Sequence, residues 1–147
     1  MSLLILPNTL FKVGYFPKDI KEVILWEHPQ YFTKYKYNKK RLMLHRASMK
    51  CYSDYIKKNK FSVRYVEFKS KYSPKNVSYF DPIDDIKLPK SLKKIQSPNF
   101  LLTDDLIEEH RKKTDKFFFN GFYMWSKKKL NIIPNQKSTD VENRKTL

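Results

Sequence analysis

The stretch from residue 34 to residue 60 constrains the fold of this chain more than any other. At 100° per residue, most of its apolar side chains fall on one half of a helix and most of its charged side chains on the other. The flanking segments 22–28 and 62–68 are rich in Val, Ile, Phe and Tyr, which is typical of short buried strands. A strand, a long helix and a second strand form a βαβ unit. We therefore predict two parallel strands joined by a right-handed crossover.

Further strands complete the predicted sheet. Residues 3–6 and 77–80 have strand composition, and the polar loop at 69–76 is too short to hold another crossover helix. Residues 87–96 fit either a stunted helix or a fifth strand, and both interpretations stay open. We predict an α/β fold: a Rossmann-like open parallel sheet of four to five strands with few crossover helices, followed by C-terminal connector helices.

Composition divides the chain into three parts. These are an N-terminal α/β domain, a helical connector and a polar tail, over residues 1–96, 97–133 and 134–147. In the connector, Thr103 has the position of an N-cap, and acidic residues followed by basic ones suit the dipole of a helix. The aromatic residues Phe118, Phe122 and Trp125 recur at helical spacing and predict a second helix.

The strong positive charge has two explanations. The formal net charge is +16 at pH 7, which favours contact with nucleic acid. Of the 31 basic residues, however, 26 are Lys, whereas Arg is preferred for bidentate contacts to phosphate and guanine. The chain is also rich in Asn, Ile, Tyr and Phe, as AT-rich coding sequences dictate. The charge is therefore either functional or compositional.

Several classes of protein find no support in the sequence. No apolar run approaches the roughly 20 residues that span a bilayer, and a single cysteine precludes an internal disulfide and fits a reducing compartment. We expect an intracellular, soluble protein, with the compartment left open. Two glycines are too few for a Walker or dinucleotide-binding loop. The three histidines lack the spacing of a structural metal site.

Two groups of polar residues have structural explanations. His45 and Cys51 fall on the apolar half of the long helix, so we interpret them as a hydrogen-bonded core histidine and a small packing residue. Asp81, Asp84 and Asp85 follow a predicted strand. A turn and a helix start explain them better than acid–base or metal chemistry, because Asp is a preferred turn and cap residue.

The most informative polar positions are Asn8 and Glu27, at the ends of the first two strands. In an open parallel sheet, ligands bind beyond the carboxyl ends of the strands, near the point where the strand order reverses. If the two strands are neighbours, both residues lie at that edge. The alternative interpretation is a turn Asn and a solvated Glu.

Longer motifs resemble a known family. LILPNTLF is similar to the first strand and turn of the photolyase-related branch of the photolyase/cryptochrome family, the bacterial-type branch with an iron–sulfur cluster. The segment from VILWEHPQYF to FSVRYVEF is similar to its second strand, long helix and third strand. YFDPIDDI, SPNFL, FYMWSKKKLNII and DVENRK follow in family order. Together, HRASMK, SPNFL and DVENRK are the specific part of the resemblance.

The resemblance implies an antenna domain followed by part of a connector to a helical flavin domain. Whole members bind FAD and use blue light to repair pyrimidine photoproducts in DNA, and many carry an antenna pigment, a lumazine in this branch. The matching positions near that pigment are Asn8 and Glu27, with Tyr31 or Phe32 as a wall of the pocket. The resemblance therefore implies a lumazine-type chromophore in this domain.

The chain also departs from the family. It stops just after DVENRK, Met124 stands where Arg is usual, and the crossover after the third strand is short. We expect neither FAD nor the iron–sulfur cluster in this chain, since one cysteine cannot supply the cluster's ligands. The leading hypothesis is a truncated or split antenna-type domain, not active alone in DNA photorepair, which docks on a separate chain carrying the flavin domain.

Two alternatives remain. One is a basic nucleic-acid-binding module, because residues 34–60 carry ten Lys or Arg against one Asp. Its candidate contacts are the bases of the long helix, Lys39, Lys40, Arg41, Arg46 and Lys50. The other is a non-functional remnant that folds poorly, because absent crossover helices would leave one face of the sheet bare.

Overall fold

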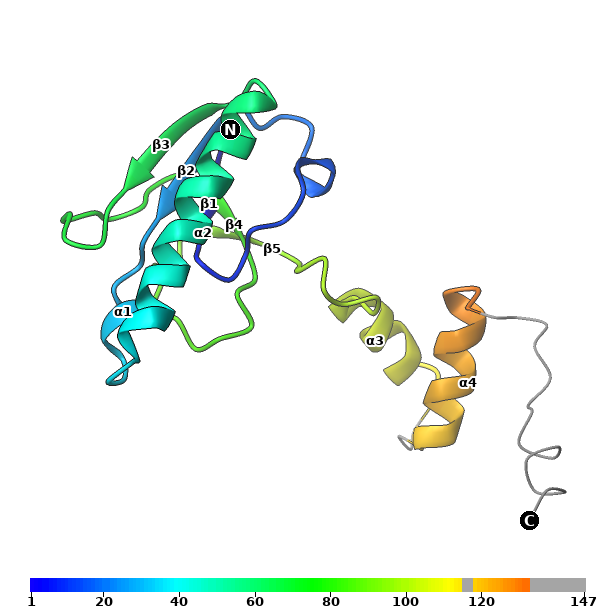
Figure 1. The fold of residues 1–147 in the computed structure, drawn as a ribbon. Coiled ribbons are helices and arrows are strands. Elements are labelled where there is room, and N and C mark those ends of the chain that lie inside the picture. Colours follow the sequence, from blue (N-terminus) through cyan, green and yellow to red (C-terminus); the bar gives the residue numbers. More distant parts are fainter. Residues whose placement is uncertain (115–117, 133–147) are drawn as a thin grey trace, which may run out of the picture. The chain divides into compact units, whose positions relative to one another are not determined.

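The computed structural model describes residues 1–114 and 118–132. Its strands and helices, all labelled in Figure 1 except η1, are β1 (Ser2–Ile5), η1 (Val13–Tyr15), β2 (Glu22–Trp26), α1 (Gln30–Thr33), α2 (Lys39–Lys58), β3 (Ser62–Val66), β4 (Val77–Phe80), β5 (Lys93–Ile95), α3 (Asp104–Arg111) and α4 (Phe119–Lys129). They fall into two compact units, residues 1–99 and 100–147. Each unit is described by itself.

The first unit is built on one five-stranded parallel sheet. The strand order is β3-β2-β1-β4-β5, and every neighbouring pair is parallel. The chain moves outward from β1 to β3 on one side and from β4 to β5 on the other. The order therefore reverses between β1 and β4, as in doubly wound nucleotide-binding folds. This confirms the predicted α/β class and the parallel pairing of the strands before and after the long helix.

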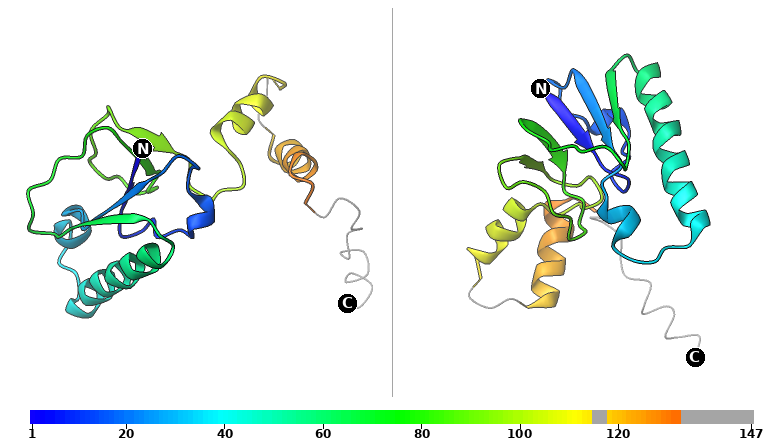
Figure 2. Two further views of the ribbon diagram at one scale, coloured as in Figure 1. Left: turned by 90° about the horizontal axis from the view of Figure 1, so that it is seen from above. Right: turned by 90° about the vertical axis from the view of Figure 1, so that its left-hand side faces the viewer.

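The first face of the sheet packs against α2, which lies along it in Figure 2. Alternate side chains of β1 and β2 point to this face, as the two-residue period of a strand requires. They meet Met49, Tyr52 and Ile56 from α2, and Phe16 and Ile20 from the segment between β1 and β2. That segment, which holds only the short η1, takes the place of a second crossover helix.

The second face is covered by loops, and the expectation of a bare face is wrong. Its buried strand residues include Leu4, Ile24 and Trp26, and the partly buried side chains packed on them include Tyr72 and Ile86 from the segments that follow β3 and β4. Large side chains on irregular backbone thus supply the apolar cover that a helix provides elsewhere.

Trp26 lies within this second face. Its ring centroid is 4.4 Å from that of His28 and 5.1 Å from that of Tyr72, both edge-on. The side chain is buried, and its Nε1 has no hydrogen-bond partner among the described residues. The aromatic contacts offset part of the cost of burying this indole.

The long helix is shorter and less buried than its sequence pattern suggests. It spans Lys39–Lys58, and the side chain of Asn38 caps it by accepting a hydrogen bond from the Lys40 backbone N–H at 2.9 Å. Cys51 and Leu44 are exposed, Leu44 at 67%, whereas Ser53 from the predicted polar half is buried. The packing role predicted for Cys51 is therefore wrong. The sheet covers a narrower arc of α2 than the apolar residues occupy.

The second unit contains the two predicted connector helices. The Thr103 hydroxyl accepts a hydrogen bond from the Leu106 N–H at 3.1 Å, which confirms the N-cap of α3. His110 at the end of α3 is buried between the rings of Phe122 and Trp125, with centroids 5.0 and 4.9 Å away. Phe118 is the N-cap of α4 and is 71% exposed. Its carbonyl accepts a hydrogen bond from the Phe122 N–H at 3.0 Å, which agrees with the helical spacing predicted for these two residues.

One acidic side chain ties the two helices of this unit together. The Glu109 carboxylate pairs with Lys113 at 2.7 Å and with Lys129 of α4 at 2.8 Å. Hydrogen bonds from these two lysines lower the pKa of Glu109 to about 2. The pairs are exposed, so their main effect is to set the register of α4 against α3.

The unit boundary at residues 99 and 100 lies close to the predicted change at residue 97. The tail predicted for 134–147 lies outside the described residues. No helix in residues 1–114 and 118–132 combines the length and apolar character that a bilayer crossing requires.

Candidate functional site

Polar and aromatic side chains gather at the carboxyl ends of β1, β2 and β4. Asn8 comes from the loop after β1, Tyr31 from α1 after β2, and Asp84 from the loop after β4. Because the strand order reverses between β1 and β4, this edge is where an open parallel sheet places its ligand crevice.

Asn8 joins the loops at this point. Its Nδ2 donates to the Pro82 carbonyl and to Oδ2 of Asp84, both at 2.7 Å, and its Oδ1 accepts from the Tyr31 hydroxyl at 2.6 Å. Desolvation, and then the charge of Asp84, raise the pKa of Tyr31, so the phenol keeps its proton and stays a donor. The side chain of Asn8 therefore joins the loops on the two sides of the crevice, across the point where the strand order reverses.

A cavity of about 280 Å³ opens beside this junction. Its lining combines aromatic rings, charged groups of both signs and two amides: Asn8, Gln30, Tyr31, Lys34, Tyr35, Tyr37, Arg41, His45, Asp84, Asp85 and Ile86. This volume is near the lower end of small-molecule sites, about 300–1,000 Å³. The lining suits a planar ring that also carries hydrogen-bonding groups.

His45 is part of this pocket and not a core residue. Its ring centroid lies 6.5 Å from Tyr31 and 6.3 Å from Phe32, and the side chain is half-buried. Burial, and then the charge of Arg41, lower the pKa of His45. At neutral pH the imidazole is therefore neutral and offers one donor and one acceptor. The interpretation as a hydrogen-bonded core histidine is wrong, since the helix turns this residue toward the crevice.

Glu27 belongs to a separate network at the same edge. Its carboxylate is fully buried and accepts hydrogen bonds from Nε of Arg46 at 2.9 Å, the Tyr65 hydroxyl at 2.6 Å and the Phe68 N–H at 2.9 Å. Burial alone would raise the pKa of Glu27, but the bonds from Tyr65, Phe68 and Arg46 outweigh it and lower the pKa. Glu27 thus joins the ends of β2 and β3 to the side of α2 and does not line the cavity.

Phe32 lies between the two networks. Its ring centroid is 5.2 Å from that of Phe68, whose backbone N–H binds Glu27, and 6.3 Å from that of His45. Like Glu27, Phe32 is absent from the residues that line the cavity. Of the four predicted pigment contacts, Asn8 and Tyr31 therefore line the cavity, and Glu27 and Phe32 do not.

The five predicted nucleic-acid contacts divide in a similar way. Arg46 binds Glu27, and Lys50 pairs with Glu67 at 3.1 Å and lies 3.7 Å over the Tyr65 ring. Two of the five cations are therefore paired with carboxylates of the protein itself. Lys39 and Lys40 are exposed in the first turn of α2, and the Arg41 guanidinium lies 4.6 Å from the Tyr37 ring centroid.

Sequence reasoning missed most of the cavity wall. Tyr35 and Tyr37 lie in the basic segment before α2, where their spacing gives no sign of a pocket, and the sequence around Asp84 predicts only a turn and a helix start. The turn is confirmed, because Asp81 accepts a hydrogen bond from the Ile83 N–H at 3.0 Å, but no helix begins there. Among the described residues, no group of three or more His, Cys, Asp or Glu side chains has metal-site geometry.

Comparison with known families adds the decisive observation. The model of a family described as deoxyribodipyrimidine photo-lyase-related protein matches residues 3–147. The chain belongs to this family. The match confirms the photolyase-related resemblance, while membership of its iron–sulfur branch stays a prediction.

A viral protein is similar over almost the same extent. Protein R852 of Acanthamoeba polyphaga mimivirus, described as uncharacterized, is 30% identical over 182 residues. The alignment covers 97% of this photolyase-related chain and 93% of R852. The similarity therefore extends over nearly the whole of both sequences.

Proposed function

We propose that this chain is an antenna-type domain of a photolyase-related protein, and that the cavity beside Asn8 holds a lumazine-type chromophore. The observation that carries the proposal is the position of this cavity at the reversal of strand order, with tyrosines and an imidazole in its lining. Aromatic walls favour a flat conjugated ring, and amide and carboxylate groups favour its polar edge.

Each part of the cavity has a role in this proposal. Tyr31, Tyr35 and Tyr37 supply ring contacts, and neutral His45 supplies a donor or an acceptor. Asp84 accepts hydrogen bonds from Asn8 and Tyr31 and is held in the cavity wall. The chromophore would supply absorption of blue light, and the protein would hold it away from water.

The chain would collect light and would not repair DNA by itself. Electron transfer would fall to FAD and, in the iron–sulfur branch, to a cluster held by several cysteines, whereas this sequence has one cysteine. We propose that a separate chain carrying the flavin domain is the partner. A purified mixture that repairs pyrimidine dimers under blue light only when both chains are present would support this arrangement.

The chromophore proposal is tested by titration with a ribityl lumazine and with flavin mononucleotide, followed by fluorescence anisotropy. We expect saturable binding of the lumazine. The variant Tyr35→Ala should weaken it about two- to tenfold, since a ring contact contributes roughly 0.5–1.5 kcal/mol. Tyr15→Ala is the matched control, because Tyr15 is exposed to a similar extent, 58% against 63%, and lies outside the cavity. The proposal would be refuted if neither the lumazine nor flavin mononucleotide binds.

A second candidate function is supported by the segment 34–41. It holds five bases and no acid, and the Tyr35 ring is 63% exposed with Nζ of Lys34 lying 5.7 Å over it. Exposed rings among cations are the usual surface for single-stranded nucleic acid. Three of these bases occupy the first turn of α2, where the helix dipole adds to their attraction for phosphate.

This second candidate makes a distinct prediction. Lys39→Gln with Lys40→Gln should weaken binding of a single-stranded oligonucleotide and reduce the salt slope by about 1.4, because two phosphate contacts are lost. Lys57→Gln with Lys58→Gln, at the other end of α2, removes the same charge and should leave the slope unchanged. Equal effects of the two pairs would indicate attraction by net charge alone.

A further inference from the structure

A stripe of residues on α2 is only partly covered in the first unit. Residues at alternating three- and four-residue steps form one line along the helix: Arg41, Leu44, Ser48, Cys51, Tyr55 and Lys58. This is the spacing by which one helix packs against another. Leu44 is 67% exposed and Cys51 is exposed, so the middle of the stripe faces solvent.

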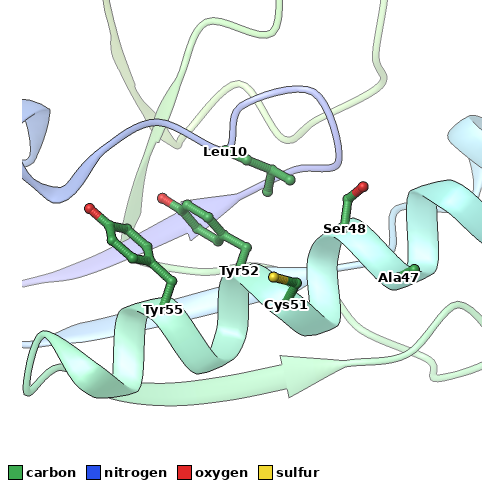
Figure 3. Close-up of a pocket in the computed structure, with 6 residues that line it drawn as sticks. All are labelled: Leu10, Ala47, Ser48, Cys51, Tyr52 and Tyr55. Carbon is green, nitrogen blue, oxygen red and sulfur yellow. The ribbon is translucent and has the colours of Figure 1, made fainter.

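The stripe forms one wall of a groove, shown in Figure 3. The groove has a volume of about 470 Å³ and is lined by Leu10, Ala47, Ser48, Cys51, Tyr52 and Tyr55. Leu10 comes from the loop after β1, and the two tyrosines point toward that loop from α2. The lining is almost entirely apolar, unlike that of the cavity at the edge of the sheet.

Two hydrogen bonds fix the opposite wall of this groove. The Tyr52 hydroxyl donates to the Phe11 carbonyl, and the Tyr55 hydroxyl accepts from the Val13 N–H at 3.2 Å. Residues 11–13 are thereby held at a constant distance from α2. The groove is preformed, so a partner would not have to order this loop when it binds.

Both ends of the stripe are positively charged. Arg41 lies at one end and Lys58 at the other, and among the described residues neither has a carboxylate within ion-pair distance. Uncovered apolar residues between two cations favour a partner with the complementary pattern. That pattern is an apolar seam with an acidic residue near each end.

We propose that this groove docks an amphipathic helix of another protein, whose apolar seam is bounded by acidic residues. The groove itself shares no lining residue with the cavity beside Asn8, but Arg41, at one end of the stripe, also lines that cavity. A docked helix would cover Leu44 and Cys51 and would place its acids against Arg41 and Lys58.

Charge argues against a second copy of this chain as the occupant. In an antiparallel pair of α2 helices, Arg41 would meet Lys58 of the other copy, and in a parallel pair Arg41 would meet Arg41. Both arrangements bring like charges together, and each copy carries a net charge of +16. The sequence 133–147 is no better suited, because its apolar residues Ile133, Val141 and Leu147 do not follow a three- and four-residue spacing.

The chain's single cysteine provides the test, since Cys51 lies in the groove and is exposed. The probes are two synthetic helical peptides with the same leucine seam, one ending in Glu at both ends and the other in Lys. Reaction of Cys51 with a disulfide reagent is followed by absorbance. At about ten times its Kd, the glutamate peptide should slow this reaction about tenfold by mass action, and the lysine peptide should leave it unchanged.

Matched variants distinguish binding of the peptide in the groove from binding elsewhere on the surface of α2. Leu44→Glu should abolish protection by the glutamate peptide, whereas Met43→Glu should preserve it. Met43 is the neighbouring exposed residue, at 61%, and lies off the stripe. Circular dichroism checks that both variants fold. Equal protection by the two peptides, protection by neither, or a dimer in sedimentation equilibrium that itself shields Cys51 would each overturn the proposal.

Discussion

Asn8 and Asp84 lie 76 residues apart in the sequence, yet Nδ2 of Asn8 donates a hydrogen bond to Oδ2 of Asp84 at 2.7 Å. The bond joins the loop after β1 to the loop after β4, across the point where the strand order reverses. A crevice between two diverging loops has a constant width only if something holds them together. Asn8 does so, and it also orients Tyr31 toward the cavity.

The first prediction concerns this junction. Asn8→Ala should lower the free energy of unfolding by about 1–2 kcal/mol, because hydrogen bonds to Asp84, Pro82 and Tyr31 are lost from a partly exposed site. Hydrogen exchange should accelerate in residues 82–86. The control, Asn59→Ala, removes a side-chain bond to the Tyr55 carbonyl at the end of α2 and should leave exchange in 82–86 unchanged. Identical exchange in the two variants would contradict the role of Asn8.

The second prediction concerns Glu27. Glu27→Gln should cost about 2 kcal/mol of stability, because a buried carboxylate that binds Arg46, Tyr65 and Phe68 is replaced by a group that cannot accept all three bonds. Chemical denaturation measures the loss. Glu67→Gln is the control, since Glu67 is 56% exposed in its pairs with Lys50 and Arg46, and the change should cost less than about 1 kcal/mol.

The same residue predicts a pH dependence. The folded pKa of Glu27 lies below its ordinary value of 4.5, so the carboxylate stabilises the fold above pH 4.5. This contribution is lost as the pH falls through the folded pKa. Wild-type stability should therefore decrease below pH 4.5, and the decrease should be smaller in Glu27→Gln. Parallel pH profiles for the two proteins would show that other carboxylates are responsible.

The third prediction tests which side of α2 faces the sheet. Ile56→Ala should destabilise the first unit by about 2–5 kcal/mol, since it opens a cavity in a fully buried position. Leu44→Ala removes a comparable apolar group from an exposed position and should change stability by less than about 0.5 kcal/mol. Thermal melts followed by circular dichroism distinguish the two. A large loss in Leu44→Ala would mean that the stripe is already covered.

The fourth prediction concerns His28. Its Nδ1 accepts a hydrogen bond from the Gln30 N–H at 3.2 Å, so the proton lies on Nε2, 3.3 Å from the Lys87 carbonyl. Burial lowers the pKa of His28 despite the bond to Lys87. The unfolded state therefore binds a proton first, and stability should fall as the pH drops below about 6.5. His28→Gln should reduce this loss, and NMR of the imidazole nitrogens should show the Nε2–H form at neutral pH.

The sequence was sufficient to predict the sheet because its strands carry strong local signals. Val23, Ile24 and Leu25 mark β2, and the amphipathic pattern of the following segment marks α2. The fifth strand was ambiguous for a physical reason. It pairs only with β4 at the edge of the sheet, and Lys93 and Lys94 are exposed, so its sequence lacks the apolar residues by which strands are recognised.

The site was predictable only in part. Asn8 followed from the rule for strand ends, whereas the surroundings of Glu27 did not, because Arg46 and Tyr65 lie 19 and 38 residues away from it. Solvation or burial of a carboxylate depends on such distant partners. The exposure of Cys51 was also unpredictable, because the pattern of a helix shows which residues are apolar but not how wide a surface will cover them.

The contact of Trp26 with His28 has a practical consequence. The chain contains two tryptophans, and each packs on a histidine of its own unit: Trp26 on His28 in the first, and Trp125 on His110 in the second. Each unit thus carries a built-in fluorescent reporter. Exchanging either indole for Phe would leave emission from the other alone, so the unfolding of the two units can be timed separately without attaching a dye.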